Sequence, residues 1–297
     1  MEWQGLDGGL GVSSLGVGTV GLAGTVETLL YAFYMAGPVT LHPDAGTFSM
    51  HWLSEPPFDT AAVAARIERI YEVMCDFFGE PEPGHRVFVR KNPYPGNGGT
   101  ALPKSFTFGW SEIEPPTVEE LASLLAHETA HNWPRLDGEH GDIAWYTEGT
   151  AEYYSIVLPY RAGLIDEAVY LGLINERARG YYTNPLQMLS NAAAYELFWQ
   201  AQRAQRVPYG RSLFYLADLD AKIRAVGDRS LDDLVLAVLE RQRAGAKVGV
   251  DAWLALVVAE LGEAARADFA AMESGEWVVS AYGAFGPGTP ARKSATT

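Results

Sequence analysis

The chain has 297 residues, enough for a sizeable core, and it is 48% hydrophobic and 20% charged, which excludes a disordered or fibrous protein. Its 22 Lys and Arg residues against 37 Asp and Glu residues give a net charge of −15, so we expect no binding to nucleic acid or to an anionic membrane. The one cysteine, Cys75, excludes an internal disulfide. With no secretory signal or membrane span evident, the composition predicts a cytoplasmic globular protein.

The first 57 residues are rich in Gly, Pro and aromatic residues and lack helical periodicity. Glycines and threonines interrupt the apolar stretch at 15–36, so short strands and turns are expected there rather than a membrane helix. We predict that residues 1–57 form a β-rich segment, interpreted as the remainder of a larger β-domain.

The pattern changes after this segment. Asp59 is a candidate N-cap, and apolar residues recur at helical spacing until Gly79, which predicts a helix between them. Short strands are expected at 87–89 and 106–108, with a loop rich in Pro, Gly and Asn at 92–99.

Beyond Pro116 the sequence predicts helices joined by short connections. Thr117 and Glu120 form a capping box ahead of an apolar run that leads into His127. Further helices are expected at 144–159, 166–180, 191–206, 209–226, 230–243, 250–261 and 263–273. The predicted fold class is therefore α+β and mainly α, with the β portion first and a flexible tail at 286–297.

The motif that carries chemistry lies in the helix begun by this capping box, where residues 127–131 read H-E-x-x-H. At about 100° per residue, His131 follows His127 by about 400°, which places both imidazoles on one helix face. Glu128 lies at the edge of that face, a geometry that suits a general base acting on metal-bound water. The motif predicts one Zn²⁺ per chain, bound in part by His127 and His131.

A catalytic zinc needs a third protein ligand and one open position for water. Asp137 has the spacing of metzincin-type peptidases, but the glycine turn that these require would fall at Pro134, which cannot adopt a positive φ. His140 lies in a loop of Asp, Gly and Glu. Glu148 is the favoured candidate, because it begins a second helix that can run antiparallel to the first and present its carboxylate to the histidines.

Taken together, the motifs resemble those of gluzincin zinc metallopeptidases. H-E-x-x-H followed by W-Y-T-E-G at 145–149 is similar to the pattern of zinc aminopeptidases, in which W-x-x-E-G carries the third ligand. Residues 209–212, 219–224 and 230–233 resemble, in order, the Y-x-K-G, L-D-x-x-I-R and S-L-D-D blocks of the glycyl aminopeptidase family. The resemblance covers about residues 99–275 and extends more distantly to the aminopeptidase N family.

This resemblance implies a thermolysin-like zinc peptidase domain at 58–285 that hydrolyses peptide or amide bonds and acts as an aminopeptidase. The residues it implies for the reaction are the zinc ligands His127, His131 and Glu148, the general base Glu128 and the oxyanion-stabilising Tyr209. Glu152, one turn after the glutamate ligand on the same helix face, is expected to accept a proton from a ligand histidine.

The sequence departs from the family at the loop that binds the substrate amino group. A Gly-Gly-Leu-Glu-His type loop is expected there, and the corresponding residues 98–105 keep Gly98 and Gly99 as candidate substrate-binding residues but contain no acid. Glu112 or Glu114 could supply an anchor for the amine instead.

Two other functions are therefore kept beside the aminopeptidase. One is a binding or scaffolding protein whose zinc is structural and closed by a fourth ligand, such as Asp137 or His140. The other is a zinc hydrolase that acts on the amide or ester of a small specialised metabolite. If the protein is an enzyme, the expected partner is a peptide or a small amide substrate.

Overall fold

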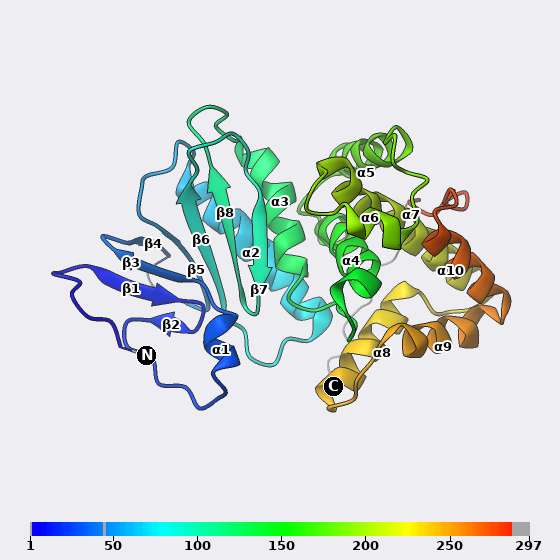
Figure 1. The fold of residues 1–297 in the computed structure, drawn as a ribbon, viewed down its shortest axis with the longest axis horizontal. Helices are drawn as coiled ribbons and strands as arrows, with labels where there is room; N and C mark the ends of the chain where they lie inside the picture. The colour runs from blue at the N-terminus through cyan, green and yellow to red at the C-terminus, as the bar shows by residue number, and fades with distance from the viewer. Residues whose placement is uncertain (1, 44–45, 287–297) are drawn as a thin grey trace. The chain divides into compact units, whose positions relative to one another are not determined.

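The computed structural model describes residues 2–43 and 46–286, so the predicted tail at 286–297 lies outside the described residues apart from Gly286. The chain forms two compact units, Met1–Asn132 and Trp133–Thr297, which run from blue to green and from green to red in Figure 1. Helices take up about half of the chain, and the described strands form two small sheets. The predicted α+β class with helical predominance is confirmed, whereas the predicted boundary between 57 and 58 stays a prediction.

The first unit begins with a small antiparallel sheet of strand order β2-β1-β3. Its strands are β1 (Leu10–Ser13), β2 (Gly16–Val17) and β3 (Tyr34–Gly37). A single helical turn, α1 (Glu27–Leu30), precedes β3. The short strands and turns expected here are found, but the glycine-rich pattern gave no indication of α1.

A second sheet of the first unit has the strand order β4-β5-β6-β8-β7. The central strands β5, β6 and β8 run parallel, and an antiparallel strand closes each side. The strands are β4 (Thr40–His42), β5 (Phe48–Trp52), β6 (His85–Lys91), β7 (Gly99–Leu102) and β8 (Ser105–Trp110).

Two of these five strands were predicted, and they extend beyond the ranges expected for them. The interpretation of residues 98–105 as a loop is wrong, because β7 pairs along its whole length with β8 through a tight turn in which Lys104 has a φ of 54°. Glycine lowers strand propensity, so the local pattern hid a strand that pairing with its neighbour stabilises.

Helices α2 (Thr60–Phe78) and α3 (Val118–Ala130) pack on the apolar side of this sheet. The predicted caps of α2 are present: the Asp59 carboxylate accepts a hydrogen bond from the backbone N–H of Ala62 at 2.9 Å, and Gly79 ends the helix with a φ of 65°. The core contains Met50, Ile67, Val87, Phe106 and Leu125, all buried.

The second unit is helical in its described part. Its helices are α4 (His140–Arg161), α5 (Glu167–Tyr182), α6 (Asn191–Glu196), α7 (Gln202–Val226), α8 (Leu231–Arg243), α9 (Val250–Leu261) and α10 (Ala264–Ser274). The expected helices at 191–206 and 209–226 need correction, because α7 runs through Pro208 and α6 ends early. Packing of α7 against α4 offsets the hydrogen bond that the proline removes.

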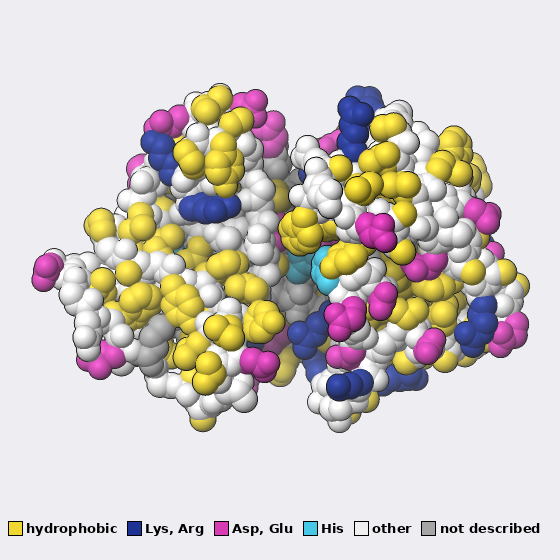
Figure 2. Space-filling model, in the orientation of Figure 1, with side chains coloured by type: hydrophobic (Ala, Val, Ile, Leu, Met, Phe, Trp, Pro, Cys, Tyr) yellow, Lys and Arg dark blue, Asp and Glu magenta, His cyan; other side chains and the backbone are white. Residues whose placement is uncertain are grey.

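Apolar side chains remain exposed on the first unit, over α1 and the sheet β2-β1-β3 (Figure 2). The most exposed of these residues include Leu22, Val26, Leu30 and Tyr31. None of the described helices combines the length and the apolar character that crossing a membrane requires.

Candidate metal centre

The helix α3 fixes the register of the H-E-x-x-H motif. Its predicted capping box is present, with Thr117 Oγ1 accepting from the backbone N–H of Glu120 at 3.2 Å and the Glu120 carboxylate accepting from the backbone N–H of Thr117 at 2.8 Å. Leu121 and Leu125 face the core, and the helix ends at Ala130. The motif thus occupies the last turn of a helix that is capped at one end and packed along its length.

The two histidines of this turn converge. His127 is 6% exposed, and its Nε2 lies 3.0 Å from Nε2 of His131, which follows the helix as its C-cap. Two imidazole nitrogens that bind one zinc at about 2.1 Å in tetrahedral geometry lie about 3.4 Å apart. The predicted shared helix face is confirmed, and the donor pair fits a zinc ion.

Glu128 is buried beside the strand β7. A Cβ atom added at Gly99 would lie 2.7 Å from Glu128 Oε1 and 2.9 Å from its Cδ, whereas a Cβ at Gly98 would have nothing within 4 Å. Gly99 therefore makes room for the carboxylate of Glu128. Because β7 is an end strand of its sheet, this carboxylate lies next to a strand edge.

Glu148 belongs to the second unit, where α4 carries it in a buried position, 7% exposed. The following residue, Gly149, marks the close approach of α4 to α7, since a Cβ there would lie 2.4 Å from Cβ of Ser212. The glycine of the W-x-x-E-G stretch thus has a packing role. Ser212 occupies the position where the glycyl aminopeptidase block has glycine, which makes this contact tighter.

Tyr209 lies on α7, three residues before Ser212, and is partly buried. The guanidinium carbon of Arg206 lies over its ring, 5.5 Å from the centroid. The packing of α7 on α4 positions the helix that carries Tyr209 relative to the helix that carries Glu148.

Glu152 is 4% exposed, and its Oε2 accepts a hydrogen bond from Nε of Arg177 on α5 at 2.7 Å. Burial acts against the charge of Arg177, but the carboxylate of Glu152 raises the pKa of this guanidinium above its ordinary value. The proton transfer predicted between Glu152 and a ligand histidine stays a prediction. Arg177 had no sequence signal, because its partner lies 25 residues away on another helix.

The other two candidates for the third ligand make contacts within the second unit. Oδ2 of Asp137 accepts from the backbone N–H of Val248 at 2.8 Å, and this bond lowers the pKa of Asp137. The ring of His140 packs against those of Tyr195 and Phe198. These contacts favour Glu148 over both.

In the described part of the chain, one group of His, Cys, Asp and Glu side chains is able to hold a metal ion, and its members are His127, His131 and Glu148. Two imidazoles and one carboxylate form a donor set that is typical of catalytic zinc, which keeps one position open for water.

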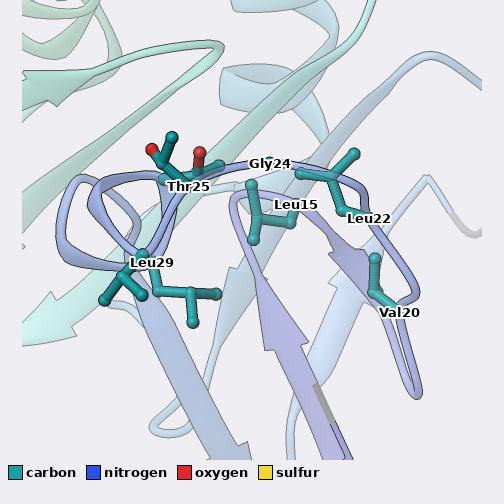
Figure 3. A pocket seen from close by; sticks show the side chains of 8 residues that line it. Leu15, Val20, Leu22, Gly24, Thr25 and Leu29 are labelled. Carbon is teal, nitrogen blue, oxygen red and sulfur yellow. The ribbon is translucent and has the colours of Figure 1, made fainter.

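A pocket in the first unit has a different character. Figure 3 shows its lining side chains, which come from the segment between Leu15 and Leu29 and are mostly aliphatic. None of the eight lining residues can bind a metal through His, Cys, Asp or Glu, so this pocket is not a candidate for the predicted chemistry.

Comparison with known proteins agrees with the predicted resemblance. The family model of the M61 glycyl aminopeptidases matches residues 137–210, a range that includes Glu148 and Tyr209. No curated protein has a sequence that matches the chain.

Several solved structures share the fold. An aminopeptidase N family protein from Idiomarina loihiensis has a TM-score of 0.75 at 16% identity, over 92% of this chain and 54% of that one. An M1 zinc metallopeptidase variant from Deinococcus radiodurans, bound to a Tyr-Ser-Ala substrate, has a TM-score of 0.58 at 18% identity, over 84% and 55%. Native yeast LTA4 hydrolase has a TM-score of 0.59 at 14% identity, over 81% and 39%.

The chain thus spans about half the length of the first two of these proteins. The matched family model and the shared fold confirm the resemblance to gluzincin aminopeptidases and support the prediction of a metallopeptidase.

Proposed function

We propose that the protein is a zinc-dependent hydrolase of peptide or amide bonds, acting as an aminopeptidase. The observation that carries the proposal is the convergence of the His127 and His131 Nε2 atoms, 3.0 Å apart, with the carboxylate of Glu128 on the same helical turn. His127, His131 and Glu148 would hold the zinc. When bound, the metal supplies an activated water and polarises the substrate carbonyl.

Side chains of the protein carry out the proton transfer, stabilise the oxyanion and orient a metal ligand. Glu128 takes a proton from the water as its oxygen adds to the carbonyl carbon, and it passes that proton to the amine as the carbon–nitrogen bond breaks. Tyr209 donates a hydrogen bond to the oxygen that becomes negatively charged. Glu152 holds the proton on a ligand histidine in place, and the hydrogen bond from Arg177 orients its carboxylate.

The peptide itself is proposed to run along β7. The edge of this strand lies next to Glu128, and an extended substrate can add to such an edge through backbone hydrogen bonds. Gly98 and Gly99 would then be the substrate-binding residues. Two acids were suggested as anchors for the substrate amine. Oε1 of Glu112 forms an ion pair with Nζ of Lys91 at 2.6 Å, so we favour Glu114 as the anchor.

We further propose that the fold of residues 58–285 is a thermolysin-like catalytic domain. The solved structures that resemble the chain support this proposal through the fold they share with it. The cytoplasmic location predicted from the composition belongs to the same set of proposals.

The alternative of a structural zinc requires a fourth protein ligand that closes the site. Asp137 and His140 were its candidates, and their contacts with Val248 and Tyr195 support an open site instead.

The test combines metal analysis with a substrate panel. Elemental analysis is expected to find one zinc per chain, and a chelator is expected to abolish hydrolysis of aminoacyl fluorogenic substrates. Glu128→Gln should retain the zinc and lower kcat about 1,000-fold, because the general base is lost. Glu119→Gln, an exposed glutamate of the same helix, is the matched control and should leave both unchanged.

Two further comparisons separate the alternatives. N-acetylated analogues show whether a free amine is required, and amides or esters of small metabolites test the third function. A metal-free protein that cannot be reconstituted with zinc, or a Glu128→Gln variant with full activity, would contradict the proposal.

A further inference from the structure

A groove in the second unit lies beside Tyr209. It runs between the end of α5 and the start of α7, and the residues on its α7 side are Gln202, Arg203 and Arg206. Asn184 shapes its opposite wall, because its side-chain amide donates to the backbone carbonyl of Arg203 at 2.8 Å. The lining contains two arginines and no acidic residue, in a chain whose net charge is −15.

Among the described residues, the two arginines have no ion-pair partner. Arg203 and Arg206 are exposed, stand three residues apart on one helix face, and have no carboxylate within 4.0 Å in the described part of the chain. They also occupy the first two turns of α7, where the helix dipole disfavours positive charge. An anion bound between them would relieve both effects.

The end of α7 itself offers further donors. Its N-cap is Ala201, which has no side chain able to cap the helix, and the first turn contains no acid. Backbone N–H groups at an uncapped helix N-terminus bind anions readily. The groove therefore combines two guanidinium groups with an uncapped helix end on the side where they lie.

Proximity to Tyr209 connects the groove to the proposed reaction. The guanidinium carbon of Arg206 lies 5.5 Å from the ring centroid of Tyr209, so an anion bound to Arg206 lies at most about 12 Å from the tyrosine hydroxyl, which three to four extended residues span. In an aminopeptidase the substrate amine lies on the acyl side of the cleaved bond. The charge at the other end of a short peptide is its terminal carboxylate.

We propose that Arg203 and Arg206 form a subsite for the C-terminal carboxylate of dipeptide and tripeptide substrates, on the leaving-amine side of the cleaved bond. This inference deepens the proposed function and rests on it for the position of the bond. Guanidinium groups suit the role, because their planar fork pairs with both oxygens of a carboxylate.

The test measures binding separately from turnover. In zinc-loaded Glu128→Gln protein, calorimetric titration is expected to give a Kd for Ala-Ala-Ala about tenfold lower than for Ala-Ala-Ala amide, and the difference should shrink at high salt. Adding Arg203→Ala and Arg206→Ala should remove the preference. Adding Arg69→Ala and Arg266→Ala, two exposed arginines outside the groove, changes the net charge equally and should leave the preference intact.

Each outcome decides the inference. Equal Kd values for acid and amide, a preference that persists without Arg203 and Arg206, or no measurable binding of either peptide would overturn the subsite. Hydrolysis of acid and amide by the unaltered enzyme at equal kcat/KM would support the proposed function and overturn the subsite. A carboxylate preference that depends on both arginines, without any hydrolysis by the unaltered enzyme, would support the subsite and overturn the proposed function.

Discussion

Two buried polar side chains, His85 in the first unit and Arg211 in the second, have different surroundings. In the first, His85 lies on β6 among the rings of Phe48, Tyr71 and Phe106, and neither of its ring nitrogens has a hydrogen-bond partner in the described structure. Burying two unpaired ring nitrogens lowers the stability of the fold, and the apolar packing around the ring offsets this loss. The same core holds the helix that carries the H-E-x-x-H motif.

In the second unit the terminal nitrogens of a buried guanidinium take part in a hydrogen-bond network, whereas its Nε has no partner in the described structure. Arg211, fully buried on α7, donates to Asn191 Oδ1 at 2.7 Å and to the backbone carbonyls of Leu189 and Gln187. Asn191 in turn donates to Glu273, whose pKa is raised by burial. Arg211 stands where the Y-x-K-G block has lysine, two residues after the proposed oxyanion donor. His85 is thus held by apolar packing and Arg211 by polar contacts.

Removing Arg211 is expected to have the largest effect. Arg211→Met leaves Asn191 and two carbonyls without their donor in a buried place, which should lower the free energy of unfolding by about 4 kcal/mol. Urea denaturation measures this loss. Arg241→Met, an exposed arginine on α8, is the control and should change the same quantity by less than about 0.5 kcal/mol. Equal effects of the two variants would contradict the network.

Gly149→Ala tests the contact between α4 and α7. It should lower the free energy of unfolding by about 3 kcal/mol, because the new methyl group would lie 2.4 Å from Cβ of Ser212. Adding Ser212→Gly should recover most of the loss, which a double-mutant cycle measures. Gly172→Ala is the matched helical control: nothing lies within 4 Å of its Cβ position, and the change should stabilise α5 by about 0.5 to 1 kcal/mol. Independent effects at Gly149 and Ser212 would contradict this account.

The sequence predicts those features of the molecule that depend on residues close together in the chain. The convergence of His127 and His131 follows from helical periodicity within five residues, and caps such as Asp59 and Thr117 are equally local. The family resemblance pointed to Glu148 and Tyr209 as well, but no local pattern explains how either is positioned.

Features set by tertiary packing escaped prediction. The strand β7 depends on pairing with β8, and α7 continues through Pro208 because it packs on α4. The partner of Glu152 and the groove at Arg203 and Arg206 join helices distant in sequence. Spacing along one helix carries information about its own face but none about which helix lies opposite.

Gly99→Ala should affect the chemistry more than the fold. The added methyl group would displace the flexible carboxylate of Glu128, so kcat/KM for aminoacyl substrates should fall about 30-fold, equivalent to about 2 kcal/mol. Gly84→Ala, at a glycine of the first unit outside β7, meets nothing within 4 Å and serves as the control. Comparable activity of the two variants would show that the space at Gly99 does not position Glu128.

The smallest expected effect concerns His85 and reverses the usual sign of a core mutation. Burial lowers the pKa of His85 from 6.5 to about 3, so the folded protein keeps the ring neutral while the unfolded chain binds a proton below about pH 6.5. Stability from the neutral ring is therefore present above pH 6.5 and lost as pH falls toward 3. His85→Phe removes two unsatisfied nitrogens at similar size and should stabilise the protein by about 1 kcal/mol at pH 7.

The gain should widen at pH 5, because the phenylalanine cannot bind a proton in the unfolded chain. His51, whose pKa burial lowers to about 4, is present in both proteins and cancels from the difference. Urea denaturation at pH 7 and pH 5 measures both values. A difference that is constant between the two pH values would mean that His85 binds a proton in the fold as readily as in the unfolded chain, and hence that the first unit accommodates a charge at this position.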